Sequence, residues 1–69
     1  QKQETRARVL AAARDLFDEV GYEGATIRLV AQRAGVAIGS VFTTFSSKAD
    51  ILSQVMQERV ERLVGKVDH

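Results

Sequence analysis

Residues 26–45 read TIRLVAQRAGVAIGSVFTTF, and this stretch decides the fold. Thr26 is a favourable N-cap residue. The apolar residues that follow it recur at the spacing of one helix face, namely Ile27, Val30, Ala31 and Ala34. Gly35 should end this helix, because glycine is the usual residue just beyond a helix C-terminus. We therefore expect a short helix over residues 27–34.

A second short helix should follow the turn at residues 34–37. Over residues 38–45, Val41 and Phe45 lie one turn apart and should be buried, while Val36 should face inward. Ala37 has no side-chain oxygen with which to cap this helix. Two short helices joined by a tight turn predict a helix-turn-helix, whose second helix fits a DNA major groove about 12 Å wide. The same pattern also suits an ordinary corner of a helical bundle, so by itself it leaves both interpretations open.

Longer amphipathic segments flank this pair. The first spans residues 5–20, and Gly21 should end it. Further along, Ser47-Lys48-Ala49-Asp50 matches a capping box, with the serine accepting from the amide three residues on and the carboxylate reaching back. A fourth helix should follow over residues 48–66. The sequence thus predicts an all-α fold, a small helical bundle with helices over residues 5–20, 27–34, 38–45 and 48–66.

The apolar stripe of the fourth helix is longer than three short helices can cover. It comprises Ile51, Leu52, Val55, Met56, Val60, Leu63, Val64 and Val67. We expect its second half, from Val60 onward, to pack on a domain outside this chain. The chain begins at Gln1, shows no leader pattern and closes on a polar tail, so we expect a cytoplasmic protein of which this is one piece.

The composition limits the possible chemistry. The 69 residues include no Cys and no Pro, and the single His is His69. Disulfides are excluded, and no apolar run is long enough to cross a bilayer. The acids Asp15, Asp18 and Glu19 line a polar helix face with no His or Cys to join them, so we interpret them as solvated surface. We expect no enzyme, no cofactor and no metal site.

Charge is unevenly distributed along the chain. The formal net charge is only +1, which gives little support for a nucleic-acid partner. Between Gly24 and Ala49, however, there is no acid, and the charged residues are Arg28, Arg33 and Lys48. One stretch is therefore locally basic within a nearly neutral chain.

The spacing of many short motifs resembles the tetracycline-repressor (TetR) family over roughly residues 6–60. The matching residues are the run 10–17 (LAAARDLF), Gly21-Tyr22, Thr26, Val30-Ala31, Ala34-Gly35-Val36, Gly39-Ser40-Val41-Phe42, Phe45 and Ser47-Lys48. The resemblance implies a homeodomain-like, helix-turn-helix DNA-binding domain over residues 1–69 of a bacterial one-component regulator, a ligand-released repressor. Its partners would be a double-stranded DNA operator with an inverted repeat, a second copy of the protein, and a small-molecule effector. Dimerisation and effector binding would belong to a C-terminal domain beyond the fourth helix, and no membrane would be involved.

The resemblance also implies which residues contact DNA. Thr26 and Lys48 would bind phosphates, and Arg28 would reach a phosphate or a base edge unless it is simply a solvated helix charge. In the third helix the matching positions are Ile38, Gly39, Ser40, Phe42, Thr43 and Thr44. For Ile38 and Phe42 the alternative is packing in the core.

The third helix departs from the family in its chemistry. Ala37, just before this helix, stands where serine is common. Within it, Ile38 stands where a polar or basic residue is common and Phe42 where tyrosine is common. It has no Arg, Lys, Asn or Gln, so bidentate pairing with guanine or adenine is not possible from it. Sequence would have to be read through hydroxyls, thymine methyl groups and DNA shape. The competing interpretation of the whole chain is a helical protein-interaction module whose apolar stripe docks a partner helix.

Overall fold

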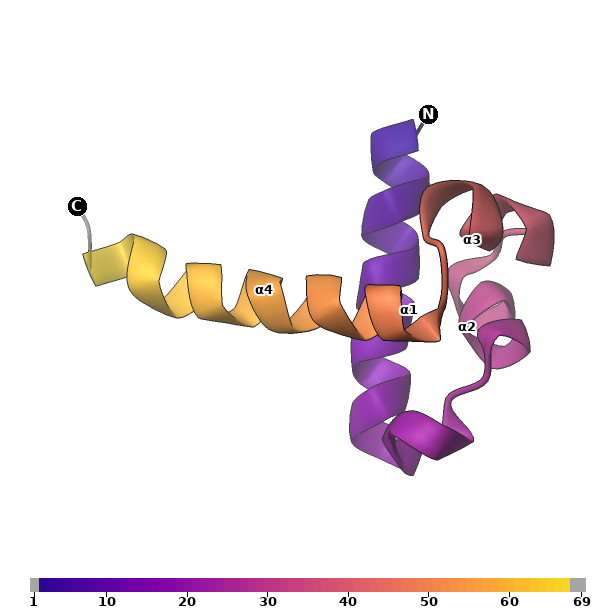
Figure 1. Cartoon of the computed structure of the whole chain (residues 1–69), viewed down its shortest axis with the longest axis horizontal. Helices are drawn as coiled ribbons and strands as arrows, with labels where there is room; N and C mark the ends of the chain where they lie inside the picture. Colours follow the sequence, from indigo (N-terminus) through magenta and orange to yellow (C-terminus); the bar gives the residue numbers. More distant parts are fainter. Residues whose placement is uncertain (1, 68–69) are drawn as a thin grey trace.

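The computed structural model describes residues 2–67, and the side chains of residues 4–61 within them. Its elements are α1 (Lys2–Gly24), α2 (Ile27–Ala34), α3 (Ile38–Thr44) and α4 (Lys48–Val67), with no strand among the described residues (Figure 1). The all-α prediction is therefore confirmed.

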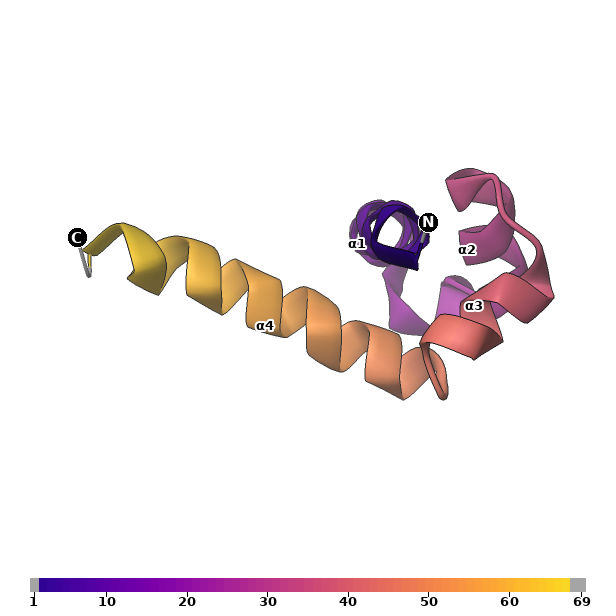
Figure 2. The ribbon, with the colours of Figure 1, turned by 90° about the horizontal axis from the view of Figure 1, so that it is seen from above.

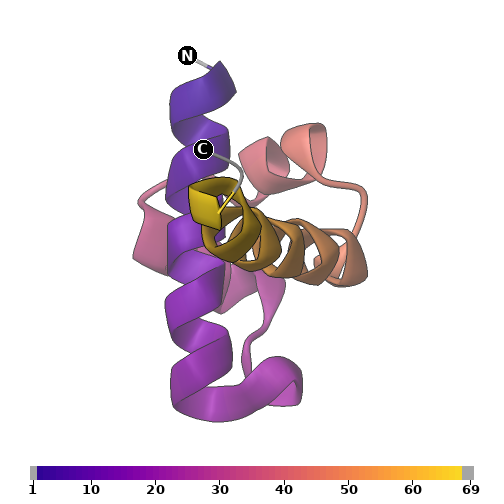
Figure 3. The ribbon, with the colours of Figure 1, turned by 90° about the vertical axis from the view of Figure 1, so that its left-hand side faces the viewer.

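Helix α1 is the centre of the arrangement. Helices α2, α3 and α4 all contact it, and α2 also contacts α3. Figure 2 shows α1 end-on, with α2 and α3 on one side and α4 running away to the other. In Figure 1 the first half of α4 crosses α1 and its second half projects beyond the other helices. Figure 3 shows the same helix running toward the viewer. The fold is a compact cluster of three helices with one helix projecting from it.

The core is entirely apolar among the described residues. Its buried members are Val9, Leu10, Ala12, Ala13, Leu16, Ala25, Val30, Ala31, Val41, Phe45, Ile51 and Val55, with no buried polar side chain. Burying a residue such as Ile51 or Val41 stabilises the fold by about 1.5–3 kcal/mol. Phe17, Ile27, Ala34 and Val36 pack against this core while partly exposed. The inward orientation predicted for Val36, Val41 and Phe45 is confirmed.

The first helix begins earlier than predicted and breaks at Gly21 as predicted. Helix α1 starts at Lys2 and extends to Gly24, with a break at Gly21, where φ is 80° and ψ is 169°. Gly21 therefore ends the regular helix as predicted, and one further helical turn, counted within α1, follows it as far as Gly24. In that turn the Ala25 amide donates to the Gly21 carbonyl at 3.1 Å. Val20, predicted to lie on the apolar stripe, is 51% exposed beside this break.

The helix-turn-helix has the capping geometry that the sequence predicts. The Leu29 amide donates to Thr26 Oγ1 at 3.2 Å. Gly35 takes the left-handed conformation (φ 75°, ψ 32°), and the amides of Gly35 and Val36 both donate to the Ala31 carbonyl, at 2.9 and 3.0 Å. Ala37 supplies no side-chain cap. Helix α3 ends at Thr44, one residue earlier than predicted, because Phe45 is extended (φ −128°, ψ 142°) and inserts into the core.

Helix α4 begins with a variant of the predicted capping box. The Asp50 amide donates to Ser47 Oγ at 3.2 Å. The Asp50 carboxylate reaches back to the Ser46 amide at 3.1 Å, one residue before the position that a standard box would use. The apolar stripe then divides: Ile51 and Val55 are buried, while Met56 and Val60 are 51% and 57% exposed. Of the residues expected to pack elsewhere, the side chains of Leu63, Val64 and Val67 lie outside the described residues.

Candidate nucleic-acid interface

Helix α3 presents three rows of side chains to solvent. With 3.6 residues per turn, the positions directly opposite the buried Val41 are Gly39 and Thr43, which we call the central row. Ile38 and Phe42 form an apolar row on one flank of it, and Ser40 and Thr44 form a hydroxyl row on the other. Each row joins residues four positions apart. All these residues are exposed except Thr44, which is half-buried.

The core-packing alternative for the apolar row is wrong. Ile38 is 41% exposed and Phe42 is 51% exposed. Phe45, three residues after Phe42, is 2% exposed and fills the core position of this segment. Because Val41 and Phe45 already complete the core, Ile38 and Phe42 are left to face outward.

The threonine hydroxyls of α3 are oriented by the backbone. Thr43 Oγ1 donates to the Gly39 carbonyl at 2.8 Å, and Thr44 Oγ1 donates to the Ser40 carbonyl at 3.1 Å. Each of these hydroxyls has thereby used its one hydrogen, and its oxygen can only accept a further bond. Between the rows, a Cβ built on Gly39 would meet nothing within 4 Å, so the surface at that point is open to a close approach by a ligand.

Lys48 is held beside the start of the helix-turn-helix by an aromatic residue. Its ammonium donates to the Tyr22 carbonyl at 2.8 Å and lies 4.2 Å from the centroid of the Tyr22 ring. That ring in turn packs against Phe17, with centroids 5.6 Å apart. The half-buried Lys48 thus joins the end of α1 to the start of α4. Sequence reasoning missed this contact between Lys48 and Tyr22, because nothing local connects two residues 26 positions apart.

The two arginines of α2 differ in their pairing. Arg33 donates to both carboxylate oxygens of Glu19, at 2.9 and 2.8 Å. This hydrogen-bonded pair lowers the pKa of Glu19 and raises the pKa of Arg33. Arg28 is exposed and has no hydrogen bond or ion pair within the described part of the chain. Of the three basic residues in the acid-free segment, Arg33 is therefore paired with a carboxylate, while within the described part of the chain Arg28 and Lys48 are not.

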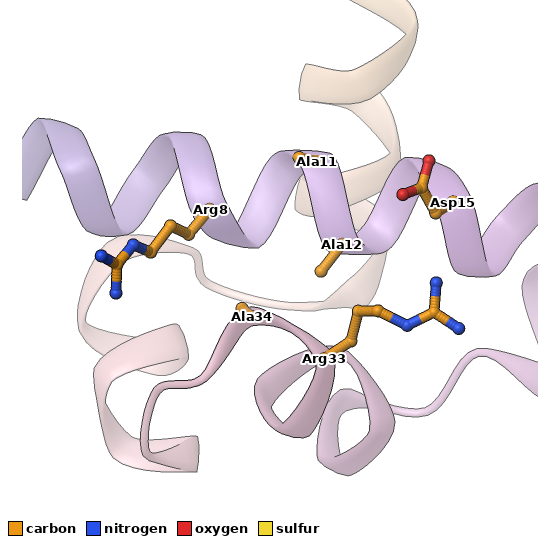
Figure 4. A pocket seen from close by; sticks show the side chains of 6 residues that line it. All are labelled: Arg8, Ala11, Ala12, Asp15, Arg33 and Ala34. Carbon is orange, nitrogen blue, oxygen red and sulfur yellow. The ribbon is translucent and has the colours of Figure 1, made fainter.

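A groove between α1 and α2 does not resemble a reactive site. It has a volume of about 300 Å³ and is lined by Arg8, Ala11, Ala12, Asp15, Arg33 and Ala34 (Figure 4). The alanines lie between the two arginines in this view. Arg33 is paired with Glu19, and Arg8 is paired with Glu4 at 2.8 Å. No group of three or more metal-ligating side chains occurs among the described residues.

Within the described residues, no helix combines the length and the apolar character needed to span a membrane.

Helix α2, the turn at Gly35 and helix α3 together form a helix-turn-helix. Residues 9–55 match the family model described as "Bacterial regulatory proteins, tetR family". The chain belongs to this family, and the prediction made from its motifs is confirmed. A DNA-binding regulator is accordingly favoured over a protein-interaction module without DNA binding.

Several curated regulators are similar to this chain. The HTH-type transcriptional repressor KstR of Mycolicibacterium smegmatis is 36% identical over 67 residues, which are 97% of this chain and 33% of that protein. The HTH-type transcriptional activator FasR of the same species is 36% identical over 66 residues, 96% of this chain and 30% of that protein. The HTH-type transcriptional regulator SrpR of Pseudomonas putida is 36% identical over 59 residues, 86% of this chain and 28% of that protein. No solved structure matches.

The chain spans about a third of the length of these relatives. All three are transcriptional regulators, and none is described as an enzyme. Because they include both a repressor and an activator, similarity at this level indicates a regulator without fixing the direction of its effect.

Proposed function

We propose that residues 1–69 are the operator-binding domain of a longer cytoplasmic regulator, a repressor that a small-molecule effector releases from DNA. The observation that carries the proposal is the outward surface of α3, which is exposed along its central and apolar rows and open at Gly39. A short helix of this kind fits a major groove about 12 Å wide. The greater length of the relatives supports a further domain after α4, and the exposed Met56 and Val60 are suited to contact it.

In this proposal, residues around α3 position the protein on the phosphate backbone. Thr26 and Lys48 contact phosphates at the starts of α2 and α4, where helix amides also favour anions. Arg28, whose charge is unpaired, reaches a phosphate or a base edge. The sequence itself is read by Ile38, Gly39, Ser40, Phe42, Thr43 and Thr44.

A dimer built through the further domain would place two copies of α3 on one face of the duplex. A two-fold dimer sets its recognition helices in successive major grooves about 34 Å apart. The operator should accordingly be an inverted repeat. Because the α3 surface has no long side chain able to form bidentate base pairings, a single domain should bind a half-site weakly.

The test is selection of bound duplexes from a random pool by the full-length regulator. We expect an inverted-repeat consensus, and affinity that falls steeply as the salt concentration rises. Gly39→Glu should abolish the enrichment, since it adds a carboxylate at an open point of the surface where it meets no protein atom. Gln57→Glu, which adds the same charge at an exposed position of α4, is the matched control and should bind normally. Failure of the parent protein to enrich any sequence would overturn the proposal.

A further inference from the structure

The chemistry of the α3 surface restricts which bases it can recognise. Its polar groups are hydroxyls alone, and those of Thr43 and Thr44 already donate to the carbonyls of Gly39 and Ser40. Each of these two oxygens can therefore only accept a further bond, and Thr43 is the exposed one of the two. Ser40 is the one hydroxyl of α3 with no hydrogen bond among the described residues.

The apolar row offers the opposite kind of contact. Ile38 and Phe42 expose methyl, methylene and ring carbon atoms on the flank away from Ser40 and Thr44. In the major groove, thymine presents a methyl group, while adenine and cytosine present exocyclic amines that donate hydrogen bonds. Guanine presents only the acceptors N7 and O6 there. The exposed groups of α3 thus complement three of the four bases and offer guanine a single donor, on Ser40.

Because α3 itself carries no acid, its hydroxyl oxygens are the side-chain acceptors that it offers. A carboxylate would accept from a cytosine amine, but it would also be repelled by the phosphates on either side of the groove. No Asp or Glu occurs between Gly24 and Ala49. Neutral oxygens held in place by the helix backbone supply the acceptor function without that repulsion.

We propose that α3 reads its half-site through methyl groups and exocyclic amines, with Ile38 and Phe42 contacting thymine and Thr43 accepting from adenine or cytosine, and that it disfavours guanine on the contacted strand. This inference rests on the proposed function, because it concerns the same surface. The expected bias against guanine follows from the hydrogen bond that each threonine hydroxyl donates to the carbonyl four residues before it. A threonine could donate to guanine only by giving up the bond to its own helix.

The first experiment separates the hydroxyl of Thr43 from its methyl group. Full-length protein is titrated on its selected operator with Thr43→Val, which removes the hydroxyl at nearly constant shape, and with Thr43→Ser, which removes only the methyl. Loss of one neutral hydrogen bond should weaken binding by roughly three- to tenfold for Thr43→Val. Thr43→Ser should lose less. Equal affinities of Thr43→Val and the parent protein would overturn the acceptor role.

The second experiment measures binding to operators with modified bases. It uses the Arg28→Ala protein, because Arg28 could otherwise donate hydrogen bonds to guanine in place of α3. Purine in place of the contacted adenine deletes the amine, and uracil in place of thymine deletes the methyl. Each modified base should weaken binding by the protein that keeps Thr43. The purine duplex should not further weaken binding by Thr43→Val, because that variant has already lost the acceptor. Substituting 7-deazaguanine for guanine in the half-site should have little effect, because Ser40 is the one hydroxyl of α3 that could donate to the acceptor it removes.

The outcomes distinguish this inference from the proposal on which it rests. If the regulator selects an inverted repeat whose α3 positions are guanine-rich and sensitive to 7-deazaguanine, the reading chemistry is wrong while operator binding stands. If the regulator selects no sequence at all, the proposed function fails as well.

Discussion

Two regions of this molecule expose apolar side chains four residues apart, and their surroundings differ. Ile38 and Phe42 on α3 are 41% and 51% exposed, and Met56 and Val60 on α4 are 51% and 57% exposed. The α3 pair lies beside hydroxyls in a segment without acids. The α4 pair is interspersed with charged residues of both signs, namely Glu58, Arg59 and Glu61.

This difference shows that apolar exposure alone does not indicate what a surface binds. Phosphates flank any major groove, so the acids around Met56 and Val60 would oppose nucleic acid there. On α4, Arg59 is further occupied by the Asp18 carboxylate, at 3.0 and 3.1 Å. The α3 surface is therefore suited to DNA, and the α4 surface to another protein surface of mixed charge.

The largest expected effect is a difference in stability between alanine variants of Phe42 and Phe45. Phe45→Ala should lower the free energy of unfolding by about 3–5 kcal/mol, because it empties a core position. Phe42→Ala should change stability by less than about 0.5 kcal/mol while weakening DNA binding. Chemical denaturation and duplex titration of both variants provide the measurement. A large loss of stability in Phe42→Ala would contradict the outward assignment of the apolar row.

The next effect tests the proposed further domain, because it should appear only in the longer protein. The double variant Met56→Gln, Val60→Gln should lower the free energy of unfolding of the longer protein by roughly 2–4 kcal/mol, through loss of buried apolar area. In the isolated 69-residue chain, where both side chains are already exposed, thermal unfolding should change little. An equal loss in both proteins would mean that α4 packs on its own domain instead.

A smaller effect concerns Lys48, which lies between the two regions. Lys48→Ala should weaken binding to operator and random DNA alike and reduce the salt slope by about one unit. Loss of the contact with the Tyr22 ring should cost only about 0.5–1 kcal/mol of stability. Lys48→Arg, which keeps the charge, should retain most of the salt slope. If unfolding of Lys48→Ala shows a collapse in stability, the lysine serves the fold and not DNA.

The smallest effect is the pH dependence of the Glu19–Arg33 pair. Because the folded protein lowers the pKa of Glu19 below its ordinary value of 4.5, the pair stabilises the fold above that pH. Its contribution should disappear as the pH falls through the lowered pKa. Denaturation of the parent and of Glu19→Gln between pH 7 and pH 3 should therefore show a difference that shrinks in acid. In an Arg33→Gln background, Glu19→Gln should make no difference at any pH.

Local signals in the sequence predicted most of the fold. Thr26, Gly35 and Ser47 marked helix ends correctly, because capping depends on side chains within a few residues of the helix terminus. The burial of Val41 and Phe45 followed from their spacing. The bounds of α1 were less predictable, since a glycine signals a break and does not show whether a helix resumes beyond it.

Contacts between distant side chains could not be predicted in the same way. The pairing of Lys48 with Tyr22, of Glu19 with Arg33 and of Asp18 with Arg59 depends on how the helices pack. Asp18 and Glu19 are exposed as expected, yet each holds an arginine of another helix. The outward orientation of Phe42 could not be predicted either, because it depends on Phe45 being the aromatic residue that packs in the core. Which of the candidate residues touch DNA stays a prediction.

The central position of α1 has a consequence for the order in which the molecule assembles. The side chains that join α1 to α4 are far apart in sequence, with Arg6 and Gln54 separated by 48 positions, whereas Glu19 and Arg33 on α1 and α2 are separated by only 14. Closing the longer loop costs more chain entropy, so α4 should dock after α1, α2 and α3 have associated. Trimming Val55 should then chiefly accelerate unfolding, whereas trimming Val30 should chiefly slow folding. The projecting helix α4 would be the last to join the other three and the first to leave them.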